Sequence, residues 1–198
     1  MGYFIRILGT EIASTPLAQL SDAARPALLD LDSTGPNEWL QLTLKHASGV
    51  EIAVVEKNPV VEGELGYEEL QELTEEVSEC EPASAVEWLQ RYLSGVKVIY
   101  AFQLLRGTDV DEGWAILHRV YNAIWKVAGG ILQADGEGFT NEAGFTILWQ
   151  FSENVTGNWN AAVLRDESRW VHFEMDLGDP THRESFKRGE VPGGAKLL

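Results

Sequence analysis

The chain has 198 residues, of which 44% are hydrophobic, and a formal net charge of −16 at pH 7. This length and apolar content suffice for one substantial domain or two small lobes, whereas the acidic balance argues against a nucleic-acid partner. A single cysteine excludes an internal disulfide framework and a cysteine-rich zinc site. There is no apolar run of transmembrane length and no signal-peptide pattern, so we expect a cytoplasmic protein without a membrane partner.

The first 57 residues predict an N-terminal α+β lobe. Residues 3–8 are expected to form a strand, residues 16–24 a short helix and residues 27–31 a second strand. Segments 38–45 and 50–56 alternate apolar and polar residues on either side of a glycine-containing turn, which is typical of a β-hairpin. In the first of these segments the alternation puts Leu40, Leu42 and Leu44 on the buried face, with Trp39 on the polar face.

Residues 58–95 predict an acidic connector of two helices, over 66–80 and 82–93. Leu70, Leu73 and Val77 form the apolar stripe of the first helix, and most of its glutamates fall on the opposite side. No lysine or arginine occurs between Glu62 and Glu87. The residues 56–87 carry eleven acids and one base, so this short segment holds most of the excess negative charge.

Residues 96–178 predict a C-terminal α+β lobe, and 179–198 a short helix with a flexible tail. Segment 96–105 is apolar on both faces, as in a central strand, and a long helix is expected from 108 to 127, ended by Gly129. Four strands follow, over 130–134, 145–151, 159–165 and 169–175. The predicted fold is α+β, with two similar lobes of antiparallel-rich sheet, each covered by a helix and joined by the two-helix segment.

The acidic helix is the candidate partner-binding surface. Glutamates four residues apart on a helix repel each other, and a soluble surface normally mixes both signs of charge. A basic protein partner would explain why this arrangement is tolerated, although a merely solvated face is the simpler alternative. The candidate residues on this surface are Glu68, Glu69, Glu72, Glu75, Glu76 and Glu79.

Two of the seven tryptophans are candidate partner anchors. Trp39 lies on the polar side of its predicted strand, and Trp159 follows Gly157 and Asn158 at a loop edge. Partly exposed tryptophan rings often anchor a partner, but they also complete hydrophobic cores.

The segment WVHFEMD, residues 170–176, is the candidate catalytic strand. Alternation along a strand puts His172, Glu174 and Asp176 on one face, where they could hold a metal ion or transfer protons. The alternative is the polar outer face of a sheet.

The loop that begins at Asp135 is rich in oxygen donors, which hard cations prefer. Its candidate metal ligands are Asp135, Glu137, Asn141 and Glu142. The loop lacks the EF-hand spacing, and its glycines also suit a turn between two strands.

The leading interpretation is therefore a non-enzymatic binding protein without a cofactor, which engages a basic protein through its acidic helix. Acidic immunity proteins that neutralise basic toxins offer an analogy, as do adaptors. The first alternative is an enzyme centred on residues 170–176, acting with a divalent metal or by acid/base chemistry. The second is a small-molecule binder that uses the C-terminal aromatic residues.

Overall fold

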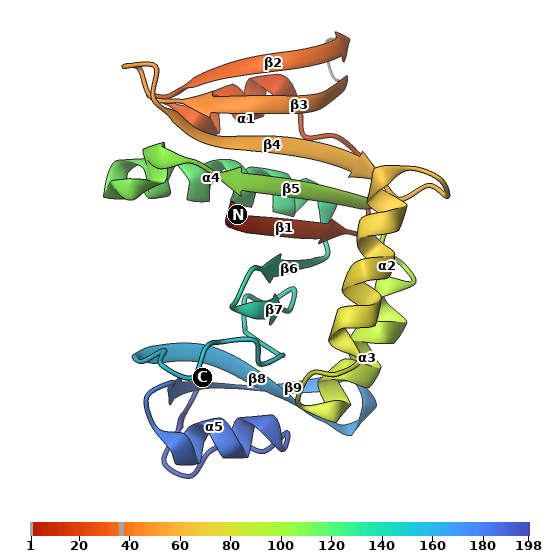
Figure 1. Ribbon diagram of the computed structural model, residues 1–198, viewed down its shortest axis with the longest axis vertical. Coiled ribbons are helices and arrows are strands. Elements are labelled where there is room, and N and C mark those ends of the chain that lie inside the picture. The colour runs from red at the N-terminus through yellow and green to blue at the C-terminus, as the bar shows by residue number, and fades with distance from the viewer. Residues whose placement is uncertain (1, 36–37) are drawn as a thin grey trace. The chain divides into compact units, whose positions relative to one another are not determined.

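The computed structural model describes residues 2–35 and 38–198 (Figure 1). These residues form five α-helices and ten β-strands, which confirms the predicted α+β class. The chain divides into two compact units, one made of residues 1–68 and 96–130 and the other of residues 69–95 and 131–198. The predicted duplication into two similar lobes is not confirmed, and the predicted boundaries after residues 57, 95 and 178 stay predictions.

The first unit contains an antiparallel sheet in the order β2-β3-β4-β5-β1. Its strands are β1 (Phe4–Gly9), β2 (Leu28–Gly35), β3 (Glu38–Lys45), β4 (Glu51–Pro59) and β5 (Val98–Leu104). β5 pairs with β1 on one side and β4 on the other, and residues 98–102 are buried. The predicted central strand is thus confirmed, and its sheet neighbours come from the first 59 residues.

Helix α4 (Asp111–Ala128) packs against α1 (Leu17–Ala24) and against strands β1 and β4. Its buried side includes Ile116, Leu117, Val120 and Ile124. The helix ends at Gly129, whose φ of 61° lies in the left-handed region that glycine accepts without strain. A short 3₁₀ turn, Arg106–Asp109, precedes α4.

Strand β3 is irregular where Trp39 lies. Gln41 pairs with Asp32 and Trp39 pairs with Ser33, so the intervening Leu40 has no partner in the ladder. Such an extra residue reverses the in–out alternation. As a result Leu40 is 53% exposed and Trp39 is 1% exposed, the opposite of the sequence prediction.

Trp39 belongs to the core of the first unit. Its indole Nε1 donates a hydrogen bond to the carbonyl oxygen of Thr15 at 3.3 Å, and its ring lies 5.6 Å from that of Tyr100. The ring is therefore not available to a partner in this fold, and Trp39 is removed from the candidate surface.

Tyr100, in the middle of β5, predicts a loss of stability at alkaline pH. Burial raises the pKa of its phenol to about 12, and its hydroxyl lies 3.3 Å from the carbonyl oxygen of Ala13. A folded-state pKa above the unfolded value of about 10 contributes stability below pH 10 that is lost as the pH rises towards 12, amounting to roughly 2–3 kcal/mol. Urea unfolding of the wild type and of Tyr100→Phe across this range measures the effect. The variant is expected to lose stability less steeply, and equal slopes would contradict the assignment.

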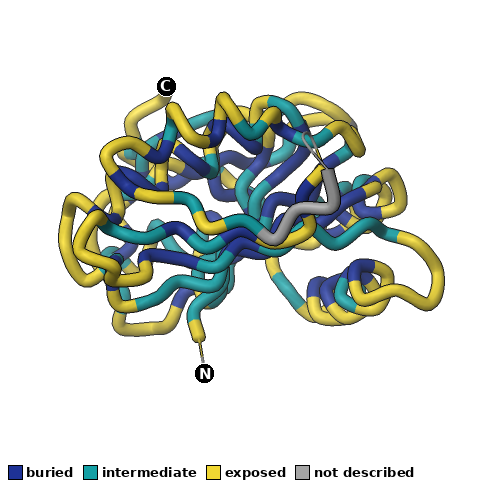
Figure 2. Tube along the Cα trace, turned by 90° about the horizontal axis from the view of Figure 1, so that it is seen from above, coloured by how far each residue is buried: buried dark blue, intermediate teal, exposed yellow. Residues whose placement is uncertain are grey.

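The second unit holds the remaining elements, with most of α2. They are α2 (Leu65–Val77), α3 (Ala83–Leu93), β6 (Ile131–Ala134), β7 (Gly138–Thr140), β8 (Asn158–Arg165), β9 (Arg169–Asp176), α5 (Pro180–Lys187) and β10 (Lys196–Leu197). β6 pairs with β7, and β9 lies between β8 and β10, all antiparallel. Leu70, Leu73 and Val77 of α2 are buried, as their spacing predicted. Figure 2 shows the buried positions of both units in dark blue and the exposed loops in yellow.

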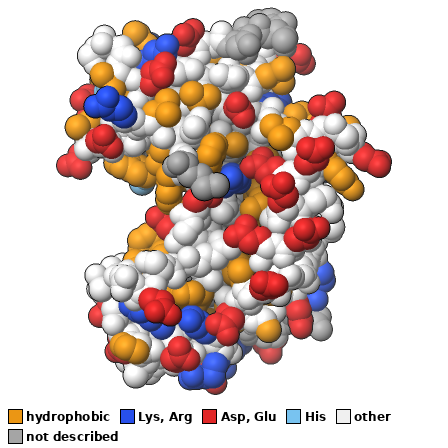
Figure 3. Space-filling view, viewed as in Figure 1, with side chains coloured by type: hydrophobic (Ala, Val, Ile, Leu, Met, Phe, Trp, Pro, Cys, Tyr) orange, Lys and Arg blue, Asp and Glu red, His pale blue; other side chains and the backbone are white. Residues whose placement is uncertain are grey.

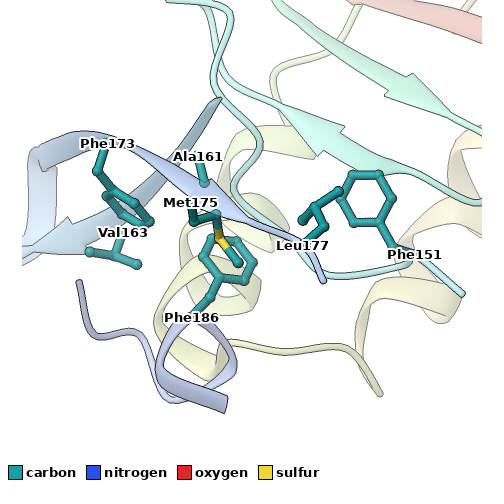
Figure 4. Close-up of a cluster of buried hydrophobic side chains, with 7 residues drawn as sticks. All are labelled: Phe151, Ala161, Val163, Phe173, Met175, Leu177 and Phe186. Carbon is teal, nitrogen blue, oxygen red and sulfur yellow. The ribbon is translucent and has the colours of Figure 1, made fainter. Parts of the chain in front are cut away.

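One hydrophobic cluster of this unit joins β8, β9 and α5. Phe186 projects from α5 towards Met175 of β9, and its ring centroid lies 6.4 Å from that of Phe173 (Figure 4). Asp179 caps α5 by accepting the backbone N–H of Thr181 at 2.7 Å. This cluster fixes the strands that carry the candidate catalytic residues.

Two predicted elements of this unit are corrected. Residues 145–151 form only isolated bridges, because Thr146 pairs with Thr140 and Ala161 while Trp149 pairs with Glu81. The segment thus shares its backbone groups among several elements and is no strand. The end of the chain is not a loose tail, since Lys196–Leu197 forms β10.

Of the helices in the described ranges, none has both the length and the apolar character needed to cross a bilayer.

Candidate functional site

The acidic surface of α2 consists of five exposed glutamates on the helix and the turn that follows it: Glu68, Glu72, Glu75, Glu76 and Glu79. In Figure 3, acidic side chains gather over this helix. Glu69 belongs to the predicted set but is only partly exposed and already contacts another group of the protein. It is therefore left out of the acidic surface.

The acidic surface is not neutralised by the described part of the chain. The ion pairs formed there involve Asp22, Asp30, Glu51, Asp166, Asp179 and Glu190, and none includes a glutamate of the acidic surface. Glu76 accepts a hydrogen bond from the side-chain amide of Gln150 at 3.0 Å, which satisfies one oxygen without removing the charge. The other four carboxylates face solvent.

This arrangement costs stability for two physical reasons. Glu68, Glu72 and Glu76 repel at successive four-residue spacings on the helix, by roughly 0.2–0.5 kcal/mol for each pair. The last turn of α2 contains no basic residue, and acids there also meet the negative end of the helix dipole. The fold thus gains nothing evident from the acidic surface.

Trp159, the second candidate anchor, is half-buried. Its indole Nε1 donates to the hydroxyl of Thr146 at 2.8 Å, and its ring packs edge-on against Phe151 at 5.3 Å. It also borders the hydrophobic cluster that contains Phe186. The structure therefore gives Trp159 a packing role, and only part of the ring remains accessible.

The three candidate catalytic side chains have separate surroundings. The His172 ring stacks on Phe145 with centroids 4.0 Å apart, and its Nε2 is buried with no hydrogen-bond partner. Glu174 accepts a hydrogen bond from Asn158 at 3.2 Å. Asp176 accepts the backbone N–H of Gly178 at 2.7 Å and is exposed. Alternation does place them on one side of β9, but each is held by different partners.

The oxygen-rich segment spans the turn between β6 and β7, which holds Asp135 and Glu137, strand β7 itself, and the turn after it, which holds Asn141 and Glu142. Asn141 is 3% exposed, and its Oδ1 accepts the backbone N–H groups of Ala143 and Phe145 at 3.1 and 3.0 Å. Glu142 accepts a 2.6 Å hydrogen bond from the hydroxyl of Tyr92. The pKa of Tyr92 is well above its ordinary value, mainly because the phenol is partly buried and also because it donates this hydrogen bond to Glu142. Two of the four candidate ligands are therefore engaged in structural contacts.

Gly138 shows why this loop needs glycine. Its φ is 96°, and a Cβ added there would lie 2.5 Å from the carbonyl oxygen of Leu148. Among the described side chains, no group of three His, Cys, Asp or Glu residues is arranged to hold a metal ion. The metal role of Asp135, Glu137, Asn141 and Glu142 stays a prediction.

Two cavities were not predicted from the sequence. One, of about 440 Å³ in the first unit, is bordered by the β3–β4 turn and the start of α4, and includes His46, Arg106 and Glu112. The other, of about 350 Å³ in the second unit, lies at the β8–β9 turn and includes His172. Neither Glu174 nor Asp176 lines the second cavity. The lining residues come from segments far apart in sequence, so no local pattern indicated them.

Comparison with known proteins gives no further guide. Neither a protein-family model, nor a curated protein, nor a solved structure matches this chain. The fold and surface define an α+β protein with an unneutralised acidic helix, and the assignment of function depends on those features alone.

Proposed function

We propose that the protein is a non-enzymatic binding protein that engages a basic protein partner through the acidic surface of α2. The observation that supports this most is that its five exposed glutamates have no ion-pair partner in the described residues. The proposal includes a cytoplasmic location, no nucleic-acid ligand, no cofactor and an immunity- or adaptor-like role. The predicted organisation into two similar lobes joined by the helical segment is kept with it.

Electrostatics gives the acidic surface its expected advantage in binding. Attraction to the lysines and arginines of a partner would outweigh the repulsion between neighbouring glutamates. The charge that destabilises the free protein would then stabilise the complex. Complementary charge also accelerates encounter and disfavours acidic competitors. Because exposed charges are screened over about 10 Å at 0.1 M salt, the affinity should fall steeply as salt is added.

The test is affinity capture with the full chain from a lysate of the cells that produce it, washed at low and at high salt. We expect a basic protein to be retained at low salt and released at high salt. Capture of acidic proteins alone, or retention that is independent of salt, would contradict the proposal.

A second candidate is an enzyme centred on residues 170–176, which uses acid/base chemistry or a divalent metal. The buried, unpartnered Nε2 of His172 favours it, because an imidazole nitrogen is both a proton carrier and a metal ligand. Metal analysis of the purified protein, combined with melting temperatures with and without added zinc or manganese, tests the metal-dependent form. Co-purification of stoichiometric metal that is lost in His172→Ala would support this candidate over the first, whereas no metal and no thermal shift would remove its metal-dependent form.

A further inference from the structure

Two arginines face each other across the β8–β9 hairpin. Arg165 is the direct cross-strand partner of Arg169, and the turn between them is formed by residues 166–168. Like charges placed directly opposite in an antiparallel pair are destabilising. This pairing is notable in a chain with 31 acids and only 15 lysines and arginines, because an acid at either position would give a favourable pair.

The described neighbours neutralise this pair only in part. Arg169 lies 3.6 Å from Asp166, and both side chains are largely exposed, at 73% and 85%, so this ion pair is weak. Arg165 has no ion-pair or hydrogen-bond partner among the described side chains, which here leave out that of Glu167. Both arginine side chains are exposed, so a ligand can reach them at the hairpin end.

Both arginines line the cavity of about 350 Å³. Trp170 forms part of its wall, and the Trp170 ring is held by an edge-on contact with Trp88 at 5.1 Å. Trp88 in turn stacks on Tyr92 with centroids 4.8 Å apart, and the Tyr92 hydroxyl is fixed by Glu142. This chain of contacts preorganises the aromatic wall, which lowers the entropic cost of binding a ligand against it.

Part of the lining of the cavity is aliphatic and comes from β10 and the residue after it. Leu197 and Leu198 line it and are 64% and 54% exposed. The backbone N–H of Leu198 donates to the carbonyl oxygen of His172 at 3.0 Å, which holds this segment beside β9. His172 also lines the cavity, although its Nε2 is buried. Cationic, aromatic and aliphatic groups therefore meet in one place.

We propose that this cavity binds a small organic anion, in which a carboxylate or phosphate group is joined to an apolar, preferably planar, body. Guanidinium groups form charge-assisted, often bidentate hydrogen bonds with either anion, and Trp170 and the leucines would bury the apolar part. A volume of about 350 Å³ lies at the lower end of the range of small-molecule sites. This site is separate from the acidic surface, so neither proposal depends on the other.

The experiment titrates the full chain with four probes: benzoate, phenyl phosphate, inorganic phosphate and neutral benzamide. Binding is followed by the NMR signal of the Trp170 indole N–H, which is assigned with Trp170→Phe. We expect saturable shifts with benzoate, phenyl phosphate or both, and the preference between these two identifies the anion. Inorganic phosphate and benzamide should bind at least about tenfold more weakly, because each lacks one half of the recognised chemistry.

The double variant Arg165→Gln with Arg169→Gln should weaken the preferred probe by about tenfold or more. It should also melt at a higher temperature than the free wild type, since the cross-strand repulsion is removed. The matched control, Arg91→Gln with Arg188→Gln, makes the same charge change on exposed residues outside the cavity and should retain the affinity. Should the double variant fail to fold, Arg165→Gln alone provides the same comparison.

Three results would overturn the proposal. The first is the absence of a saturable shift with every probe up to about 10 mM, well above the dissociation constant of a weak specific site. The second is equal affinity in the cavity variant and the control variant. The third is equal affinity for inorganic phosphate and phenyl phosphate, which would show that the aromatic and aliphatic walls have no part in binding.

Discussion

Replacing Trp39 by alanine is expected to lower the free energy of unfolding by about 3–5 kcal/mol, the usual cost of truncating a large buried aromatic side chain. Trp39 is 1% exposed, packs beside Tyr100 and donates its indole N–H to the Thr15 carbonyl. The substitution would remove the ring and its hydrogen bond and leave a cavity within the first unit. It tests the strand irregularity at Leu40, because a regular strand would have exposed Trp39.

The matched control is Leu40→Ala, one residue along the same strand. Leu40 is 53% exposed, so its truncation should change the stability by no more than about 0.5 kcal/mol. Urea denaturation of both variants gives the comparison. If Leu40→Ala were the more damaging of the two, strand β3 would have the regular alternation, with Leu40 buried and Trp39 exposed.

A glycine-to-alanine change at Gly113 is expected to destabilise the protein by about 3 kcal/mol, at the upper end of the cost of overpacking. In an ordinary helix this change stabilises by up to about 1 kcal/mol, since alanine is the better helix former. Gly113 lies in the first turn of α4, where an added Cβ would lie 1.8 Å from the carbonyl oxygen of Gly107. The backbone cannot move aside as a flexible side chain can. The close approach therefore makes the substitution destabilising, although alanine favours the helix.

Ala115→Gly, in the same helix, provides the contrast. Ala115 is exposed, and its replacement should cost only the propensity difference of about 1 kcal/mol. Thermal unfolding of the two variants measures both effects. A Gly113→Ala protein more stable than the wild type would show that α4 and the 3₁₀ turn before it do not approach as closely as the structure shows.

Elements with strong local patterns could be predicted from the sequence. The apolar stripe of α2, the end of α4 at Gly129, and the strands β8 and β9 all have the expected character. Each depends on residues close together in the chain, where periodicity and glycine conformation give a direct signal.

Elements that depend on distant partners could not be predicted. The extra residue at Leu40 arises from the way β3 pairs with β2, so the alternation of apolar and polar residues in β3 does not indicate it. Residues 145–151 alternate like a strand, yet their backbone groups pair with three separate segments. The place of β5 between β1 and β4 likewise pairs residues that are at least 39 positions apart in the chain.

The candidate sites divide in the same way. The acidic surface belongs to one helix and the turn after it, so spacing alone placed its glutamates together. Only the structure could show that, within the described ranges, distant lysines and arginines form no ion pair with five of them. The cavity at the β8–β9 turn combines a hairpin with the end of the chain. A sequence signal for it did exist in hindsight, because Arg165 and Arg169 flank a three-residue turn and so had to face each other.

The most direct test of the acidic surface compares two variants with the same net charge. One replaces Glu68, Glu72, Glu75 and Glu79 by glutamine. The other replaces four exposed acids elsewhere, which are Glu11, Asp109, Glu153 and Glu184, by their amides. Each takes the formal net charge from −16 to −12.

The measurement is the affinity of each variant for the basic protein captured by the wild type, at low salt. We predict that the first variant binds roughly 30-fold more weakly and is itself more stable, while the control stays within about threefold of the wild type. Equal affinities of the two variants would contradict the account.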